Sequence, residues 1–150
     1  MNDKWNLRFM ELALNVAGWS KDPSTKVGAV VVDDKKRFVS LGFNGFPAGV
    51  YDASELSRER KLMRTVHAEV NAVSFAPRSV EGCSIYTTHP PCASCAGILI
   101  QHGIKKVYFP RASEEFLSRW GSSFLEGIQM FIEAGVGFEE VSMNPYAENE

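Results

Sequence analysis

Hydrophobic side chains recur at helical spacing in the first segment of the chain. They lie three or four positions apart, at Trp5, Phe9, Leu12 and Val16. This spacing predicts an amphipathic helix over residues 4–18, with a glycine at its end. The next apolar stretch, residues 27–32, is nearly continuous and mostly β-branched, which is typical of a strand buried on both faces.

Helical and strand patterns continue to alternate along the rest of the chain. The expected strands span residues 27–32, 37–42, 84–88, 106–109 and 136–141. The expected helices span residues 4–18, 54–64, 67–75, 92–102 and 114–134. This alternation predicts an α/β fold, a three-layer α/β/α sandwich around a mixed five-stranded sheet.

No repeat, low-complexity tract or linker divides the sequence. We therefore expect one domain over residues 1–150, a length that can bury a sizeable core. The tail from 144 to 150 is polar, contains Pro145 and is expected to fray.

Composition and charge narrow the function classes. Hydrophobic residues make up 45% and charged residues 23% of the chain, which is normal for a folded globular protein. The net charge is −2, whereas proteins that grip DNA or structured RNA need many Lys and Arg contacts to phosphate, so we expect no nucleic-acid partner. The sequence has no membrane-length apolar run and no signal peptide, so we expect a cytoplasmic protein without a membrane partner.

Two short motifs carry candidate chemistry. One is His67-Ala68-Glu69, and the other is the CxxC formed by Cys92 and Cys95. Each motif lies at a predicted strand-to-helix junction, where free N–H groups and the helix dipole stabilise thiolates. One imidazole and two thiolates make a good zinc set.

The missing fourth ligand indicates catalysis, because structural zinc sites have four protein ligands and catalytic sites keep a position for water. Glu69 follows His67 by two positions, so it is expected beside the metal rather than on it. There it can take a proton from activated water and return it to a substrate nitrogen. The pair H-x-E and P-C-x-x-C is the known signature of zinc deaminases.

The alternative is a closed structural site with Cys83 as the fourth ligand. The strand predicted at 84–88 rises ~3.3 Å per residue and would hold Cys83 too far from Cys92. We therefore expect Cys83 to be a small buried residue.

Longer stretches around these motifs carry a family resemblance. They read SKDPSTKVGA at 20–29, GFNGFP at 42–47, HAEVNA at 67–72 and QHGIKKV at 101–107. Over roughly residues 5–141 the chain resembles the zinc-dependent cytidine deaminase superfamily, and within it the deoxycytidylate (dCMP) deaminases.

The resemblance implies hydrolysis of dCMP to dUMP and ammonia, which supplies a precursor for dTMP synthesis. It implies one catalytic zinc ion per subunit on His67, Cys92 and Cys95, with Glu69 as the proton shuttle.

The resemblance also implies substrate contacts. Asn44 would hydrogen-bond the sugar, and the backbone N–H of Ala68 would hold the pyrimidine O2. A backbone carbonyl near Thr88 or His89 would accept from the 4-amino group.

A phosphate site is expected at Ser24, Thr25 and Lys26, where hydroxyls, N–H groups and a cation converge in a turn. The alternative is that Lys26 is a solvated surface charge and that Ser24 merely caps a turn. A second basic cluster is either a solvated helix face or a lid near an anionic substrate. It comprises Arg58, Arg60, Lys61 and Arg64.

Members of this family are often hexamers that respond to dCTP and dTTP, so the resemblance implies a homo-oligomer with these effectors. An aromatic stripe at Trp120, Phe124 and Phe131 is either core or a subunit contact. Other functions stay open: deamination of deoxycytidine or a 5-substituted dCMP, adenosine deamination in tRNA, or a catalytically silent zinc-binding module. The intact Glu69 favours an enzyme over the last of these.

Overall fold

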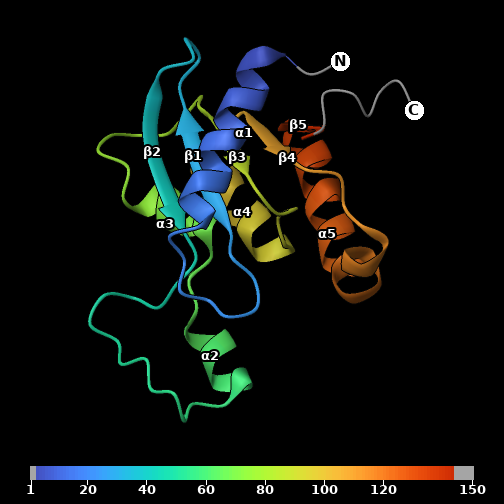
Figure 1. Ribbon diagram of the computed structural model, residues 1–150. Helices are drawn as coiled ribbons and strands as arrows, with labels where there is room; N and C mark the ends of the chain where they lie inside the picture. Colours follow the sequence, from blue (N-terminus) through green and yellow to red (C-terminus); the bar gives the residue numbers. More distant parts are fainter. Residues whose placement is uncertain (1–2, 144–150) are drawn as a thin grey trace.

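The computed structural model describes residues 3–143, which build a mixed five-stranded sheet flanked by helices (Figure 1). The strands are β1 (Gly28–Val32), β2 (Phe38–Phe43), β3 (Ser84–Thr87), β4 (Lys106–Phe109) and β5 (Gly137–Glu140). Their order in the sheet is β2-β1-β3-β4-β5. Strand β1 is antiparallel to both β2 and β3, while β3, β4 and β5 are parallel, so the predicted mixed sheet is confirmed.

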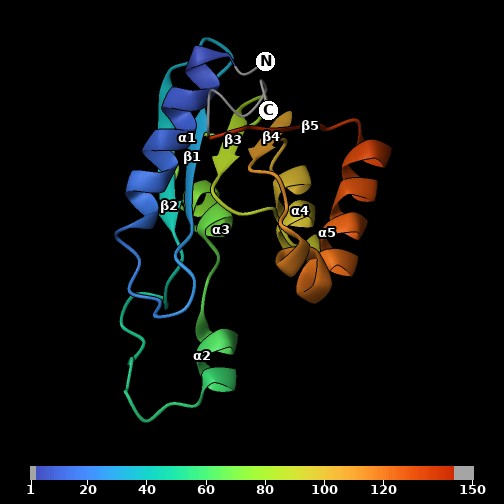
Figure 2. The same cartoon turned by 45° about the vertical axis from the view of Figure 1, so that its right-hand side comes forward.

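Helices cover both faces of this sheet (Figure 2). They are α1 (Lys4–Ala17), α2 (Arg58–Arg64), α3 (Ala68–Ser74), α4 (Ala93–Gln101) and α5 (Glu114–Ala134). Helix α1 packs on one face, and α3, α4 and α5 lie on the other, which confirms the predicted three layers. Helix α2 stands apart from the sheet, in the connection between β2 and α3.

The position of β1 in the sheet explains why its sequence is apolar throughout. Val30 and Val32 face α1, whereas Ala29 and Val31 contribute to the larger core under the other helices. Because both faces are covered, alternation between polar and apolar residues is absent.

The predicted element boundaries hold to within about two residues, with one larger difference. Helix α2 begins at Arg58 rather than at residue 54, because the Ser57 side chain accepts a hydrogen bond from the Arg60 N–H and caps it. Within residues 3–143, no helix is long and apolar enough to span a membrane. The expected fraying of 144–150 lies outside the described residues, and the single domain over 1–150 stays a prediction.

Helix α3 approaches β2 closely at Gly42. A Cβ at this position would lie 2.4 Å from the Ala72 backbone nitrogen and 2.6 Å from the Ala68 carbonyl oxygen. Only glycine permits this approach, because no real Cβ contact is that short. The start of α3, and with it His67, is therefore set by the absence of a side chain on β2.

We expect Gly42→Ala to displace α3 and to destabilise the protein by roughly 3 kcal/mol or more, since the clashing atoms are backbone. Gly45→Ala is the matched control, because a Cβ there meets nothing within 4 Å. Urea unfolding of both variants checks this. Equal urea midpoints of the two variants would show that α3 can move away from β2 without loss of stability.

Candidate active site

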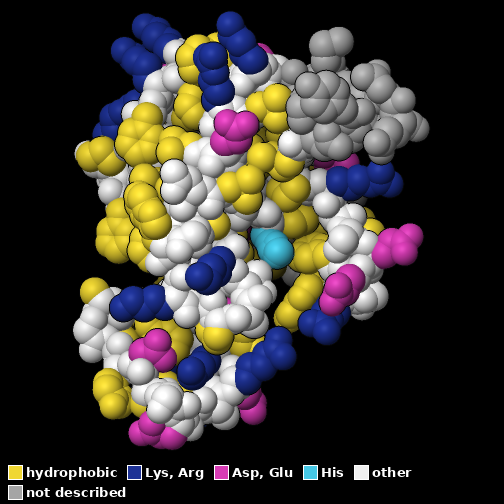
Figure 3. All heavy atoms as spheres, in the orientation of Figure 1, with side chains coloured by type: hydrophobic (Ala, Val, Ile, Leu, Met, Phe, Trp, Pro, Cys, Tyr) yellow, Lys and Arg dark blue, Asp and Glu magenta, His cyan; other side chains and the backbone are white. Residues whose placement is uncertain are grey.

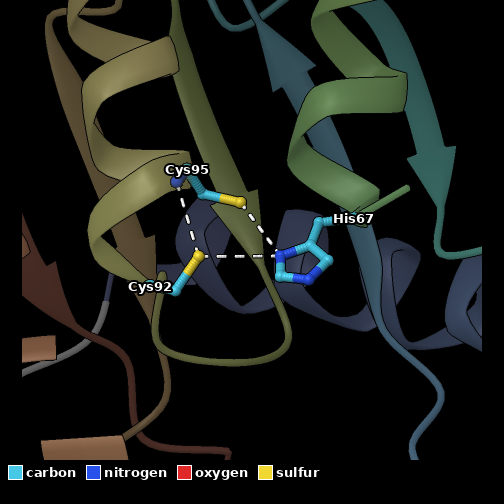
Figure 4. Close-up of side chains that lie close together, drawn as sticks. All are labelled: His67, Cys92 and Cys95. Carbon is cyan, nitrogen blue, oxygen red and sulfur yellow. Dashed lines mark hydrogen bonds between the residues drawn. The ribbon is translucent and has the colours of Figure 1, made fainter. Parts of the chain in front are cut away.

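Three metal-ligand side chains meet between the first turns of α3 and α4 (Figure 4). His67 is the N-cap residue of α3, Cys92 is the N-cap residue of α4, and Cys95 lies in the first turn of α4. The His67 Nδ1 atom lies 3.2 Å from Cys95 Sγ and 3.6 Å from Cys92 Sγ. All three ligand atoms lie within 4.8 Å of one another.

Local hydrogen bonding prepares this cluster for a cation. The Cys95 N–H donates to Cys92 Sγ at 3.4 Å. Hydrogen bonds with Cys95 and then with His67 lower the pKa of Cys92 to about 4, and the hydrogen bond with Cys92 raises the pKa of His67. The hydrogen bond with Cys92, together with burial, raises the pKa of Cys95. Without a metal, the cluster thus favours a thiolate at Cys92 and keeps protons on its other two members. A metal must displace these protons to bind, so metal affinity falls at acidic pH.

The donor set and its spacing fit zinc. A tetrahedral zinc with Zn–S bonds of ~2.3 Å and Zn–N bonds of ~2.0 Å holds its sulfur and nitrogen ligands roughly 3.5 Å apart. The sulfur–nitrogen distances of 3.2 and 3.6 Å match that separation. Cys83 is 2% exposed at the other end of β3 and is outside the only such cluster among residues 3–143. Three protein ligands leave a fourth position, as in catalytic zinc sites.

Glu69 lies buried beside the triad, in the first turn of α3. Its side chain is 4% exposed, and the Thr87 hydroxyl donates to Glu69 Oε1 at 3.4 Å. Burial raises the pKa of this carboxyl group. Glu69 is not one of the clustered ligands, so the arrangement is a metal triad with a separate proton-carrying group. Thr87, which is fully buried at the end of β3, was not among the residues predicted for the site.

Asn44 is engaged in holding the backbone of the preceding loop. Its Oδ1 accepts from the Val27 N–H, and its Nδ2 donates to the Thr25 carbonyl, both at 2.9 Å. Ser20 Oγ donates to the Asn44 carbonyl oxygen at 2.8 Å. One lone pair and one N–H of the amide remain for another partner.

The turn expected to hold phosphate is already organised by Asp22, which the sequence analysis did not single out. Asp22 Oδ1 accepts from the Ser24 N–H, the Ser24 hydroxyl and the Thr25 N–H at 2.9–3.0 Å. The D-P-S-T sequence is a signal for this Asx-type turn. Lys26 is exposed and is the remaining charged group of the turn.

A cavity of about 310 Å³ separates this turn from α2. Asp22 and Ser24 line one side, and Arg58 and Lys61 line the other. Lys and Arg side chains gather in this lower part of the molecule, over α2, together with a few acidic ones (Figure 3). Arg58 and Lys61 of α2 therefore face a hollow next to the loop that Asn44 holds.

The remaining predicted substrate residues lie around the two helix starts. Ala68 is fully buried as the first residue of α3. Thr88 is fixed against β1, because its Oγ1 accepts from the Gly28 N–H at 3.0 Å. His89 is half-buried with its ring 5.8 Å from that of Phe116, and burial lowers its pKa.

The fold is a three-layer α/β/α sandwich, and its site combines one histidine, two cysteines and a buried carboxylate at two helix starts. This combination defines a zinc-dependent deaminase. Residues 3–110 match the family described as the cytidine and deoxycytidylate deaminase zinc-binding region. The chain belongs to this family.

Individual relatives agree with this membership. An "uncharacterized deaminase in luxG 3′ region" of Aliivibrio fischeri is 52% identical, covering 91% of this chain and 92% of the relative. The deoxycytidylate deaminase of Mus musculus is 39% identical over 71% of this chain, which spans 64% of the mouse protein. The dCMP deaminase of cyanophage S-TIM5, solved in complex with dCMP and dUMP, superimposes with a TM-score of 0.76 and 28% identity, covering 94% of this chain and 99% of that one.

We expect the Cys92→Ala variant to lose zinc, because the two remaining ligands, His67 and Cys95, are too few to hold the ion. Cys83→Ala is the matched control and should keep about one zinc per chain, since Cys83 lies outside the triad. Zinc content after gel filtration, measured by plasma mass spectrometry, checks both. Loss of zinc from the Cys83 variant would make Cys83 a fourth ligand of the metal.

We expect Glu69→Gln to keep its zinc and to raise the melting temperature of the metal-free protein at pH 7. Burial raises the folded-state pKa of Glu69, so the folded protein holds a proton that the unfolded chain releases above its value of 4.5. Wild-type stability is therefore lost as pH rises through the folded-state pKa, and glutamine carries no such penalty.

The two melting temperatures should converge as pH falls below 4.5, where the carboxyl is neutral in both states. Each kcal/mol corresponds to about 3 °C in a chain of this length. A glutamine variant that melts lower than wild type at pH 7 would contradict the cost assigned to burial.

Proposed function

We propose that this protein hydrolyses dCMP to dUMP and ammonia and so supplies a precursor for dTMP synthesis. The observation that carries the proposal is the three-ligand triad with Glu69 buried at its side. The dCMP and dUMP bound in the cyanophage relative, and the name of the mouse relative, support dCMP as the substrate.

His67, Cys92 and Cys95 would hold the zinc ion. When bound, zinc acts as a Lewis acid that makes a hydroxide nucleophile available near neutral pH. Glu69 takes a proton from the attacking water on its carboxylate and gives it to the pyrimidine N3. It then takes the second proton, from the hydroxyl added at C4, and gives it to the amine, which leaves as ammonia. Its raised pKa suits both directions of transfer, and Thr87 holds the carboxyl group by its Oε1 atom.

The pyrimidine is oriented by backbone groups at the two helix starts. The Ala68 N–H donates to O2 of the base, and a carbonyl at Thr88 or His89 accepts from the 4-amino group. The bond between Thr88 Oγ1 and the Gly28 N–H fixes that carbonyl segment. Asn44 hydrogen-bonds the sugar with the part of its amide that the loop backbone leaves free.

The 5′-phosphate is held at the turn of Ser24, Thr25 and Lys26. Because Asp22 already binds the N–H groups of this turn, Lys26 contributes most of the positive charge there. Arg58 and Lys61 face the same turn across the cavity of about 310 Å³. This arrangement favours Arg58 and Lys61 as part of a lid over an anionic substrate.

We also propose a homo-oligomer, a hexamer, with dCTP and dTTP as effectors. Of the aromatic stripe on α5, Phe124 and Phe131 are buried, whereas Trp120 is 53% exposed. Trp120 therefore supports a subunit contact, and apolar side chains also gather along the β2 side of the molecule (Figure 3). We place the protein in the cytoplasm, with neither a nucleic-acid nor a membrane partner.

We expect the zinc-loaded protein to deaminate dCMP, and to act on deoxycytidine and CMP at least 10-fold more slowly, since each lacks or changes a recognised group. Loss of the amino-pyrimidine absorbance measures all three reactions. Turnover of deoxycytidine but not of dCMP would contradict the proposed phosphate site and would still agree with the proposed zinc chemistry. No turnover of any substrate by zinc-loaded protein would contradict the proposed function.

Variants within the same assay separate the phosphate contacts. Lys26→Glu and the double variant Arg58→Ala/Lys61→Ala should raise KM for dCMP and leave deoxycytidine turnover unchanged. Arg60→Ala is the matched control, since Arg60 lies on α2 and does not line the cavity. An unchanged KM for dCMP in the Lys26 variant would make Lys26 a solvated surface charge.

A further inference from the structure

Helix α5 contacts the metal-binding turn, although it lies beyond the residues that match the zinc-binding family. The match ends at residue 110, and α5 begins at Glu114. Ser123 of α5 accepts a hydrogen bond on Oγ from the Ala93 N–H at 2.9 Å. Ala93 directly follows the ligand Cys92, so the bond reaches the backbone of the metal-binding turn.

A second contact lies one helical turn further along α5. Gly127 is buried, and a Cβ there would lie 3.2 Å from Ala96 Cβ and 3.7 Å from the Cys92 carbonyl oxygen. Ser123 and Gly127 are four residues apart, so they present the same face of α5 to α4.

Two hydrogen bonds hold the peptide unit that joins Cys92 to Ala93. Ser123 Oγ accepts from its N–H, and its carbonyl oxygen accepts from the Ala96 N–H at 2.9 Å, while the missing side chain at Gly127 lets α5 pack closely on α4 at this point. A peptide unit is planar and includes the Cα atom of Cys92, so holding its two polar ends fixes that Cα atom and the direction of its Cα–C bond. The ψ angle of Cys92, which is 168°, and the side-chain rotamer then set the direction of Cys92 Sγ.

Helix α5 is itself held firmly enough to act as a support. Phe131 is fully buried, and Phe124 packs edge-on against Phe109 with ring centroids 5.6 Å apart. Phe124 also contacts Phe116 at 6.0 Å. These contacts anchor α5 in the core on both sides of Ser123.

We propose that Ser123 and Gly127 are positioning residues for the metal ligand Cys92, so that α5 sets the zinc affinity of the site. Groups that orient a ligand without touching the metal commonly account for 10- to 100-fold in metal affinity. The inference depends on zinc binding by the triad and not on dCMP as the substrate.

The test is zinc affinity, measured by competition with a chromogenic chelator at a temperature where every variant is folded. Ser123→Ala should weaken zinc binding roughly 10- to 100-fold. Ser123→Thr keeps the hydroxyl and should restore most of the affinity. Ser122→Ala is the matched control, because Ser122 is exposed on the same helix and should bind zinc like wild type.

Gly127→Ala is an independent probe of the same contact. It should weaken zinc binding in the same range, since the added Cβ presses on α4. Gly121→Ala is its matched control, because it changes helix propensity equally but meets only Leu117 side-chain atoms at 3.7 Å or more. If the Gly127→Ala variant does not fold, the zinc affinities of the Ser123 variants test the proposal alone.

A purely structural role predicts a different pattern. A substitution that only weakens folding lowers the urea midpoint of the metal-free protein and leaves the zinc affinity of the folded protein unchanged. A positioning role also shifts the ligand-field bands of the cobalt-substituted protein, because the direction of a thiolate changes. Wild-type zinc affinity and cobalt bands in Ser123→Ala would overturn the proposal, as would an equal loss of affinity in Ser122→Ala.

Discussion

The site depends on the close approach of backbone to backbone around two helix starts. Helix α3 rests on β2 at Gly42, where a Cβ would lie 2.4 Å from the Ala72 nitrogen. Helix α4 rests on α5 at Gly127, where a Cβ would lie 3.2 Å from Ala96 Cβ. These two contacts place the N-cap residues His67 and Cys92 where their side chains meet. Small residues are therefore as much a part of the metal site as the ligands are.

The ionisable groups of the site are arranged to bind a cation. In the metal-free protein, Cys92 has a pKa lowered to about 4, Cys95 has a raised pKa, and Glu69 is buried with a raised pKa. Burying several acidic groups within a few ångströms costs stability unless protons or a metal offset their charge. Glu69, whose burial weakens the metal-free fold, is also the proton carrier, which is the usual relation between stability and activity at an active site.

The metal site and the proposed substrate site are built in different ways. Two helix starts fix the metal ligands, whereas side-chain bonds to backbone hold the loops of the proposed substrate site. Asn44 holds the backbone of Thr25 and Val27, and Asp22 closes the turn before them. Helix α2 stands outside the layered core, and its Arg58 and Lys61 line the cavity that separates it from the Asp22 turn. The metal ligands thus lie on the layered core, and the residues proposed to select the substrate lie at its periphery.

The order and type of the elements follow from the amino-acid sequence, because periodicity and helix caps are local properties. The sequence also identified His67, Cys92 and Cys95 as partners, since their motifs match known zinc chemistry. The tertiary structure was needed to show that Asp22 occupies the donors expected for phosphate, and that Thr87 binds Glu69. It alone brought Ser123 to Ala93, thirty residues away in the chain. Such contacts join segments whose separation in sequence carries no local signal, so packing of the layers had to place them together.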